Sequence, residues 1–106
     1  MAKEFDSGPP FRPGQVSGMD LGIVRAVKLL TEAGIETYES CEGGPGHAYP
    51  QPTVRFYGES EAGWRALAVC LAHGLPTLAL RRVWKILTNG EPVGPDWELV
   101  FRRKLD

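Results

Sequence analysis

Hydrophobic and polar positions along the chain follow two periods, and each period predicts a different kind of element. Apolar side chains in residues 21–33 recur at helical spacing, at Ile23, Val27 and Leu30. Gly34 follows them as the left-handed residue that commonly ends a helix. Residues 35–40 have the length and β-branched content of a strand. Residues 52–58 alternate between apolar and polar side chains, as a half-buried strand does.

The same succession returns in the second half of the chain. Residues 61–73 have helical spacing, with an expected apolar stripe of Trp64, Leu67 and Leu71, and Gly74 follows. Residues 78–87 alternate as a strand. Residues 88–96 contain an Asn-Gly turn signal, and residues 97–104 alternate again. The chain therefore predicts helix, strand, strand, twice over.

This order predicts an α+β fold with αββαββ topology. Its simplest form is a two-layer sandwich, in which a four-stranded, mostly antiparallel sheet carries both helices on one face. The two halves, residues 20–58 and residues 60–103, resemble each other weakly. That likeness is equally consistent with a duplicated αββ unit and with coincidence.

Strand alternation assigns the side chains of the sheet to two faces. The side expected to face the helices carries Val54, Phe56, Leu80, Trp84, Trp97, Leu99 and Phe101. Trp64, Trp84 and Trp97 are expected to share one core. The opposite, open face carries Arg55, Tyr57, Arg81, Val83, Lys85, Glu98, Val100 and Arg102. A solvated antiparallel face is ordinary, but Tyr and Arg are also enriched at interfaces.

Composition narrows the class of protein. A chain of 106 residues fits one domain, expected at residues 19–106, after a flexible N-terminal arm at residues 1–18 that is rich in Gly and Pro and has no period. A net charge of −1 makes nucleic acid an unlikely partner. Two cysteines form no disulfide framework, and no apolar run is long enough for a membrane span, so a cytoplasmic protein is expected.

The segment "ESCEGGPGHAYPQPTVRFYG", residues 39–58, concentrates chemically special residues in one connection. Its glycines permit positive φ and close approach of the backbone to a ligand. The segment is neither a Walker A loop nor a dinucleotide-binding loop, because it lacks the Lys-Ser/Thr pair and the surrounding βαβ unit. We expect it to bind an anionic small molecule, of nucleotide type, through Gly43, Gly44, Gly46, His47, Tyr49, Arg55 and Tyr57.

Three other interpretations of the same residues stay open. In a Cys-dependent enzyme, Cys41 would be the nucleophile and His47 its base, although the adjacent carboxylate of Glu42 disfavours a thiolate. In a purely structural loop, the glycines and prolines would only shape a hairpin. In a protein-binding inhibitor, the open sheet face and the N-terminal arm would contact the target.

No metal and no other cofactor is expected. Cys41, Glu42, His47 and His73 have the right chemistry for zinc, but a Cys-x5-His spacing is not a standard ligand pattern. A homodimer is expected instead, because closed two-fold pairs are the commonest soluble assemblies. Its contact surface would be the open sheet face, where apolar side chains interrupt the charges at Tyr57, Val83 and Val100.

The string S-C-E-G-G-x-G-H-x-x-P-x-P-T-V-R-F, together with "RALAVCLAHGLP", "RRVW" and "GPDWELVF", resembles a group of short hypothetical proteins from bacteria and their phages. The resemblance covers roughly residues 20–102. It implies a cytoplasmic accessory protein, of a kind that binds a host protein or sequesters a small host signal.

Overall fold

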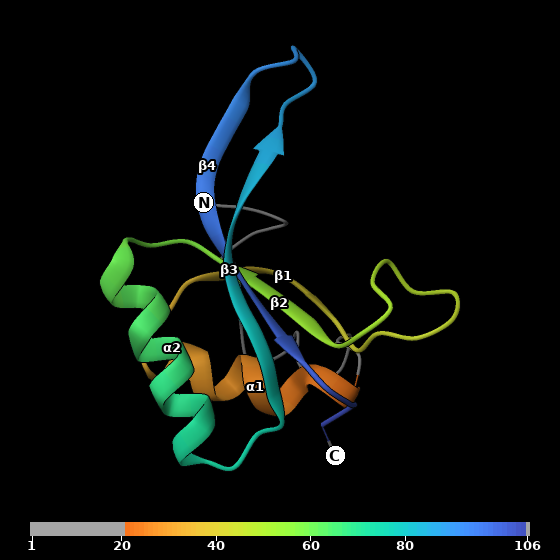
Figure 1. Ribbon diagram of the computed structural model, residues 1–106, viewed down its shortest axis with the longest axis vertical. Coiled ribbons are helices and arrows are strands. Elements are labelled where there is room, and N and C mark those ends of the chain that lie inside the picture. Colours follow the sequence, from red (N-terminus) through yellow and green to blue (C-terminus); the bar gives the residue numbers. More distant parts are fainter. Residues whose placement is uncertain (1–20, 106) are drawn as a thin grey trace.

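The computed structural model describes residues 21–105, and these form two helices and one four-stranded antiparallel sheet (Figure 1). The elements are α1 (Leu21–Glu32), β1 (Thr37–Cys41), β2 (Thr53–Phe56), α2 (Ser60–Ala72), β3 (Thr77–Ile86) and β4 (Pro92–Phe101). The predicted α+β class and αββαββ order are confirmed. The arm expected at residues 1–18 lies outside the described residues.

The strands are arranged in the order β1-β2-β4-β3, so the last strand of the chain lies inside the sheet. β2 pairs with β4 from Thr53 opposite Val100 to Phe56 opposite Trp97. On its other side β4 pairs with β3, which is the edge strand. α1 packs on β1 and β2 and α2 packs beside β3, so both helices cover the same face (Figure 1).

The core lies between this face and the helices. The predicted stripe of α1 is buried in it, and the strands contribute alternate side chains. Its largest fully buried members are Phe56, Phe101, Ile23, Leu30, Leu99, Val27 and Val54. Neither helix of the described residues is long and apolar enough to cross a membrane.

The stripe predicted for α2 is wrong. The side of α2 that faces the core carries small residues: Ala62, Gly63, Ala66 and Cys70. A Cβ at Gly63 would overlap the ring of Trp97, so the helix approaches the sheet more closely than a stripe of large side chains permits. Trp64 and Leu71 are turned outward as a result, with Trp64 67% exposed, whereas Leu67 is partly buried against the core. Size at the contact, rather than hydrophobicity, sets the rotation of this helix.

Trp84 also lies outside the core, and it is 58% exposed. β2 accompanies β4 only along residues 97–100, whereas the β3–β4 hairpin continues to Ile86 opposite Pro92. Figure 1 shows this half of the hairpin projecting away from the helices. The pairing register shifts between Val83 and Lys85, so simple alternation fails at Trp84.

The predicted turn at residues 88–96 is too long, because β4 begins at Pro92. Prolines fit here because this part of β4 has β3 as a neighbour but lies beyond its pairing with β2. Of the three tryptophans, Trp97 packs against the core. Its ring is stacked 6.4 Å from Phe56, and its indole N–H donates to Glu59 O at 2.9 Å.

These placements predict opposite results for two large aromatic side chains. Phe101→Ala removes a fully buried ring and should lower the free energy of unfolding by about 3–5 kcal/mol. Trp84→Ala removes an exposed ring and should change it by less than about 0.5 kcal/mol. Urea denaturation of both variants is the measurement. A cost above about 2 kcal/mol for Trp84→Ala would contradict the projecting hairpin.

Burial raises the pKa of Cys70 from 9.0 to about 11. The folded state therefore holds this proton more tightly than the unfolded state, and that stabilisation is complete below pH 9.0 and lost as pH rises through about 11. The stability of the wild type should fall more steeply over this window than that of Cys70→Ala. Parallel slopes in denaturation series at pH 8 to 11 would contradict the buried position of this thiol.

Candidate functional site

The glycine-rich loop joins β1 to β2 and extends from one end of the sheet (Figure 1). Gly43, Gly44 and Gly46 have φ of +82°, +105° and +83°, a region that favours glycine. At Gly43 a side chain is also excluded by space, because a Cβ would lie 2.6 Å from Pro52 N. At Gly46 nothing lies within 4 Å of that position. The two sides of the loop are thus in close contact at Gly43, whereas there is open space beside Gly46.

Several amide groups of this loop are bonded within it. The N–H of Gly44 donates to the carbonyl oxygens of Tyr49 and Pro50, both at 3.1 Å. The N–H of His47 donates to Gly44 O at 3.1 Å, and that of Gly43 donates to Cys41 Sγ at 3.4 Å. These donors stabilise the loop itself. An anion near the loop would therefore be held mainly by side chains.

Glu42 attaches the loop to the beginning of α1. Its Oε1 accepts the N–H of Gly22 at 3.0 Å, where the helix dipole favours a negative charge. Its Oε2 lies 3.5 Å from His47 Nε2 and 3.5 Å from Lys104 Nζ. His47 is thereby drawn toward α1 and the C-terminal end of the described chain.

The contacts of Cys41 are those of a packing residue. Its side chain is buried at the end of β1, and its sulfur accepts the Gly43 N–H. The imidazole of His47 contacts the carboxylate of Glu42 through Nε2. These contacts give no support to a Cys41–His47 catalytic pair. No group of three or more His, Cys, Asp or Glu side chains within residues 21–105 is gathered as metal ligands.

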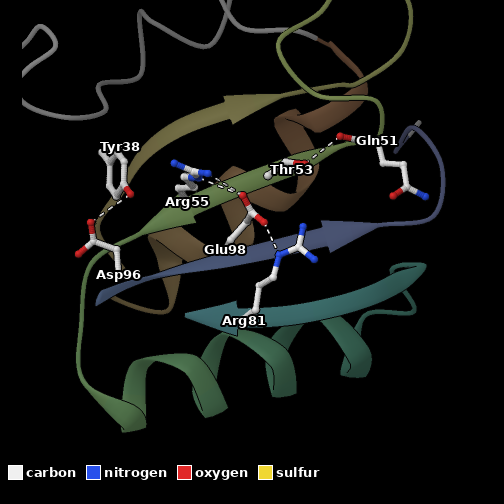
Figure 2. Close-up of polar contacts among 7 residues, drawn as sticks. All are labelled: Tyr38, Gln51, Thr53, Arg55, Arg81, Asp96 and Glu98. Atoms are coloured by element: carbon white, nitrogen blue, oxygen red, sulfur yellow. Dashed lines mark hydrogen bonds and ion pairs between the residues drawn. The ribbon is translucent and has the colours of Figure 1, made fainter. Parts of the chain in front are cut away.

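A row of three charged side chains crosses the open face of the sheet (Figure 2). The strand register places Arg55 of β2, Glu98 of β4 and Arg81 of β3 opposite one another. Arg55 Nε and NH2 each lie 3.0 Å from Glu98 Oε2. Arg81 Nε lies 2.6 Å from Glu98 Oε1. Two guanidinium groups thus hold one carboxylate, and the row has a net positive charge.

The carboxylate at the centre of this row is buried. Glu98 is 3% exposed, so its charge depends on the two arginines. Burial lowers the pKa of Arg55, but the hydrogen bond to Glu98 and the nearby charges outweigh it, and the net direction is upward. Tyr49 places its ring 5.4 Å from Arg55 Cζ. Burial and the charge of Glu39 raise the pKa of Tyr49 to about 12, so its phenol remains neutral.

A second polar cluster adjoins the row on the same face. Tyr38 donates its hydroxyl hydrogen to Asp96 Oδ2 at 3.1 Å, and burial and that carboxylate raise the pKa of Tyr38 (Figure 2). Lys85 Nζ lies 3.4 Å from Asp96 Oδ2 and 4.1 Å from the centre of the Tyr38 ring. The Tyr57 ring lies 4.5 Å from that of Tyr38. Cationic and aromatic groups therefore alternate along this face.

The expected ligand-binding side chains lie in two places, one at the open face of the sheet and one beside α1. Tyr49 and Arg55 are in contact, and Tyr57 lies with Tyr38 and Lys85 on the open face. His47 lies on Glu42 at α1. The expected set omitted Arg81, although alternation placed it on this face. The contact of Arg81 with Glu98 depends on the strand order, which alternation does not predict. Because β4 lies between β2 and β3, Glu98 has an arginine on each side.

The apolar part of the open face is smaller than expected. Val100 is buried and Val83 is half-buried, whereas Tyr57 is exposed. The homodimer proposed for this face stays a prediction, and Tyr57 is its main exposed apolar contact.

Two loop glycines allow a matched test of the loop structure. Gly43→Ala combines an unfavourable φ with overlap against Pro52, and it should destabilise the protein by more than about 2 kcal/mol. Gly46→Ala has the same backbone strain without overlap, and it should cost about 1 kcal/mol. Thermal unfolding of both variants separates the two effects. Equal losses would show that Gly43 does not close the loop.

Comparison of the chain with protein-family models, with curated proteins and with solved structures finds no match. The resemblance to short bacterial and phage proteins therefore stays a prediction, and the functional inference depends on the geometry of the open face.

Proposed function

We propose that this chain is a small binding protein that holds an anionic small molecule of nucleotide type on the open sheet face, beside the glycine-rich loop. The observation that supports it most directly is the row formed by Arg55, Glu98 and Arg81. A buried carboxylate fixes two guanidinium groups in place, so an anion would meet cations whose positions are already set.

The two arginines have different parts in this proposal. Glu98 contacts two nitrogens of Arg55 but only Nε of Arg81 among the described contacts. The side chain of Arg81 is 62% exposed, against 22% for Arg55. Arg81 would therefore contact the anion through its terminal nitrogens. Arg55, which is less exposed, would contribute a positive charge near the anion without contacting it directly.

The neighbouring rings favour an anion that carries an aromatic group. Tyr57 is exposed, and its ring packs against Tyr38 with Lys85 Nζ 5.0 Å from its centre. An exposed ring that is held in place by a neighbouring ring offers a stacking surface for a base. Phosphate oxygens on Arg81 and a base on Tyr57 would together use the length of the open face.

Charge balance favours a small ligand over a polymer. Arg55, Arg81 and Lys85 face the carboxylates of Asp96 and Glu98. Glu39 of β1, which is opposite Arg55, adds a third carboxylate, so these three cations are balanced by three acids. A polynucleotide would need a broader basic surface than this, and the chain as a whole is slightly acidic. The role that fits the resemblance is an accessory protein that sequesters a small anionic signal in the cytoplasm.

The proposal predicts a specific loss of affinity. Isothermal titration calorimetry against a panel of nucleotides and inorganic phosphate should detect a ligand for the wild type. Arg81→Ala should then weaken binding of that ligand by about 1.5–3 kcal/mol, the scale of a hydrogen bond to a charged group. Arg103→Ala, which removes an exposed cation beyond the end of β4, should leave the affinity unchanged.

Two results would overturn this function. One is a wild type that gives no heat with any member of the panel. The other is an equal loss for Arg81→Ala and Arg103→Ala, which would reduce the interaction to nonspecific attraction. Turnover distinguishes the enzyme alternative, because a Cys-dependent enzyme would convert the ligand and lose that conversion in Cys41→Ala, whereas a binding protein leaves the ligand unchanged.

A further inference from the structure

A groove of about 400 Å³ lies between α2 and β3, on the helix side of the sheet and away from the open face. Its walls contain no charged side chain. They are Trp64, Leu67 and Leu71 of α2, Thr77, Leu78, Ala79 and Leu80 of β3, and Trp97 of β4. The groove is therefore an apolar surface separate from the proposed anion site.

Several of the side chains that line the groove are large apolar ones that lie outside the core. α2 turns its small residues to the core, so Trp64 and Leu71 stand exposed beside β3. Leu78 is exposed on the strand itself. An exposed group of this kind commonly marks a site for another protein.

The backbone beside the groove is able to accept a further strand. β3 is at the edge of the sheet, and within residues 21–105 it pairs with β4 alone. The outer edge of such a strand presents N–H and C=O groups to a ligand. When an extended peptide pairs with an edge strand, the main chain supplies affinity and alternate side chains enter the neighbouring pockets.

The charges of β3 specify the chemistry of that peptide. The strand reads "TLALRRVWKI", so its first part adjoins the groove and its second part carries Arg81, Arg82 and Lys85 without any acid of its own. Arg81 and Lys85 contact acids of β4, whereas Arg82 contacts only carbonyl oxygens among the described polar contacts and has no carboxylate beside it there. A complementary strand has apolar side chains opposite the first part and acidic side chains opposite the second. Opposite charges stabilise cross-strand neighbours, and like charges destabilise them.

The same charges disfavour a second copy of this chain. Full-length antiparallel pairing of two β3 strands, Thr77 opposite Ile86, places Arg81 of one copy opposite Arg82 of the other. That arrangement opposes like charges at the centre of the pairing. A partner with acidic residues avoids this repulsion.

From the groove, the edge of β3 that is unpaired within residues 21–105 and the basic half of this strand, we propose that this chain docks an extended segment of another protein, with alternating apolar and then acidic side chains, as a fifth strand beside β3. The groove is separate from the anion site, but the two sites share Arg81, so a bound anion and an acidic side chain of the peptide would compete for that guanidinium group.

A synthetic peptide of about ten residues, the length of β3, tests the proposal. The probe has Leu alternating with Thr in one half and Glu alternating with Thr in the other, with a fluorescent label. Fluorescence anisotropy should show binding at or below about 100 µM protein, as expected for a small interface. The same peptide with Lys in place of Glu should bind about tenfold more weakly. A peptide with N-methylated backbone amides along the pairing edge should not bind.

Two exposed apolar side chains supply the variants of the protein. Trp64→Ser removes a wall of the groove and should weaken binding about tenfold. Val93→Ser removes an exposed side chain of β4 that lies neither on β3 nor in the groove, and it should change the affinity less than about twofold. Because both side chains are exposed, both variants are expected to fold, which circular dichroism checks.

Several outcomes would overturn the proposal. They are no binding of the Glu peptide, equal affinity for the Glu and Lys peptides, and equal losses for Trp64→Ser and Val93→Ser. Light scattering gives one more. A wild-type dimer that becomes a monomer in Trp64→Ser would assign the groove to a second copy of this chain.

Discussion

The rest of the described structure depends on pairing the carboxylate of Glu98. This carboxylate is a charge buried on a sheet face that carries no helix within residues 21–105. A buried charge is tolerated only when it is paired and hydrogen-bonded. The strand order meets that demand by placing β4 between β2 and β3, so that an arginine approaches from each side. The strand order therefore has two effects. It pairs the buried carboxylate of Glu98, and it holds two guanidinium groups on the open face.

A second constraint comes from the small residues of α2. Because Ala62, Gly63, Ala66 and Cys70 bring this helix close to the sheet, Trp64 and Leu71 lie outside the core. They line a groove beside the edge strand β3 instead. We therefore propose different partners for the two faces of the sheet, a small anion for the open face and an apolar strand for the helix side.

The sequence was sufficient to predict the element order, the class of fold and the stripe of α1, because each depends on local periodicity. It was insufficient where long-range contacts decide. Trp84 follows the alternation of β3 but lies beyond the support of β2 and after a register shift. Trp64 belongs to a regular helical stripe, yet the close approach of Gly63 to Trp97 turns it outward. For the site, alternation placed Arg55, Arg81 and Glu98 on one face, but their contact requires a strand order that local pattern does not contain.

The central claim is that Arg55 and Arg81, held by Glu98, form a fixed cationic site on the open face. Nitrogen-15 NMR of the arginine side chains tests it directly, by following each Nε–Hε resonance while inorganic pyrophosphate is added to the wild type. The account predicts saturable shifts for Arg81 and smaller ones for Arg55, with Arg103 unchanged. Uniform small shifts of all arginines, or a response confined to those away from the open face, would contradict it.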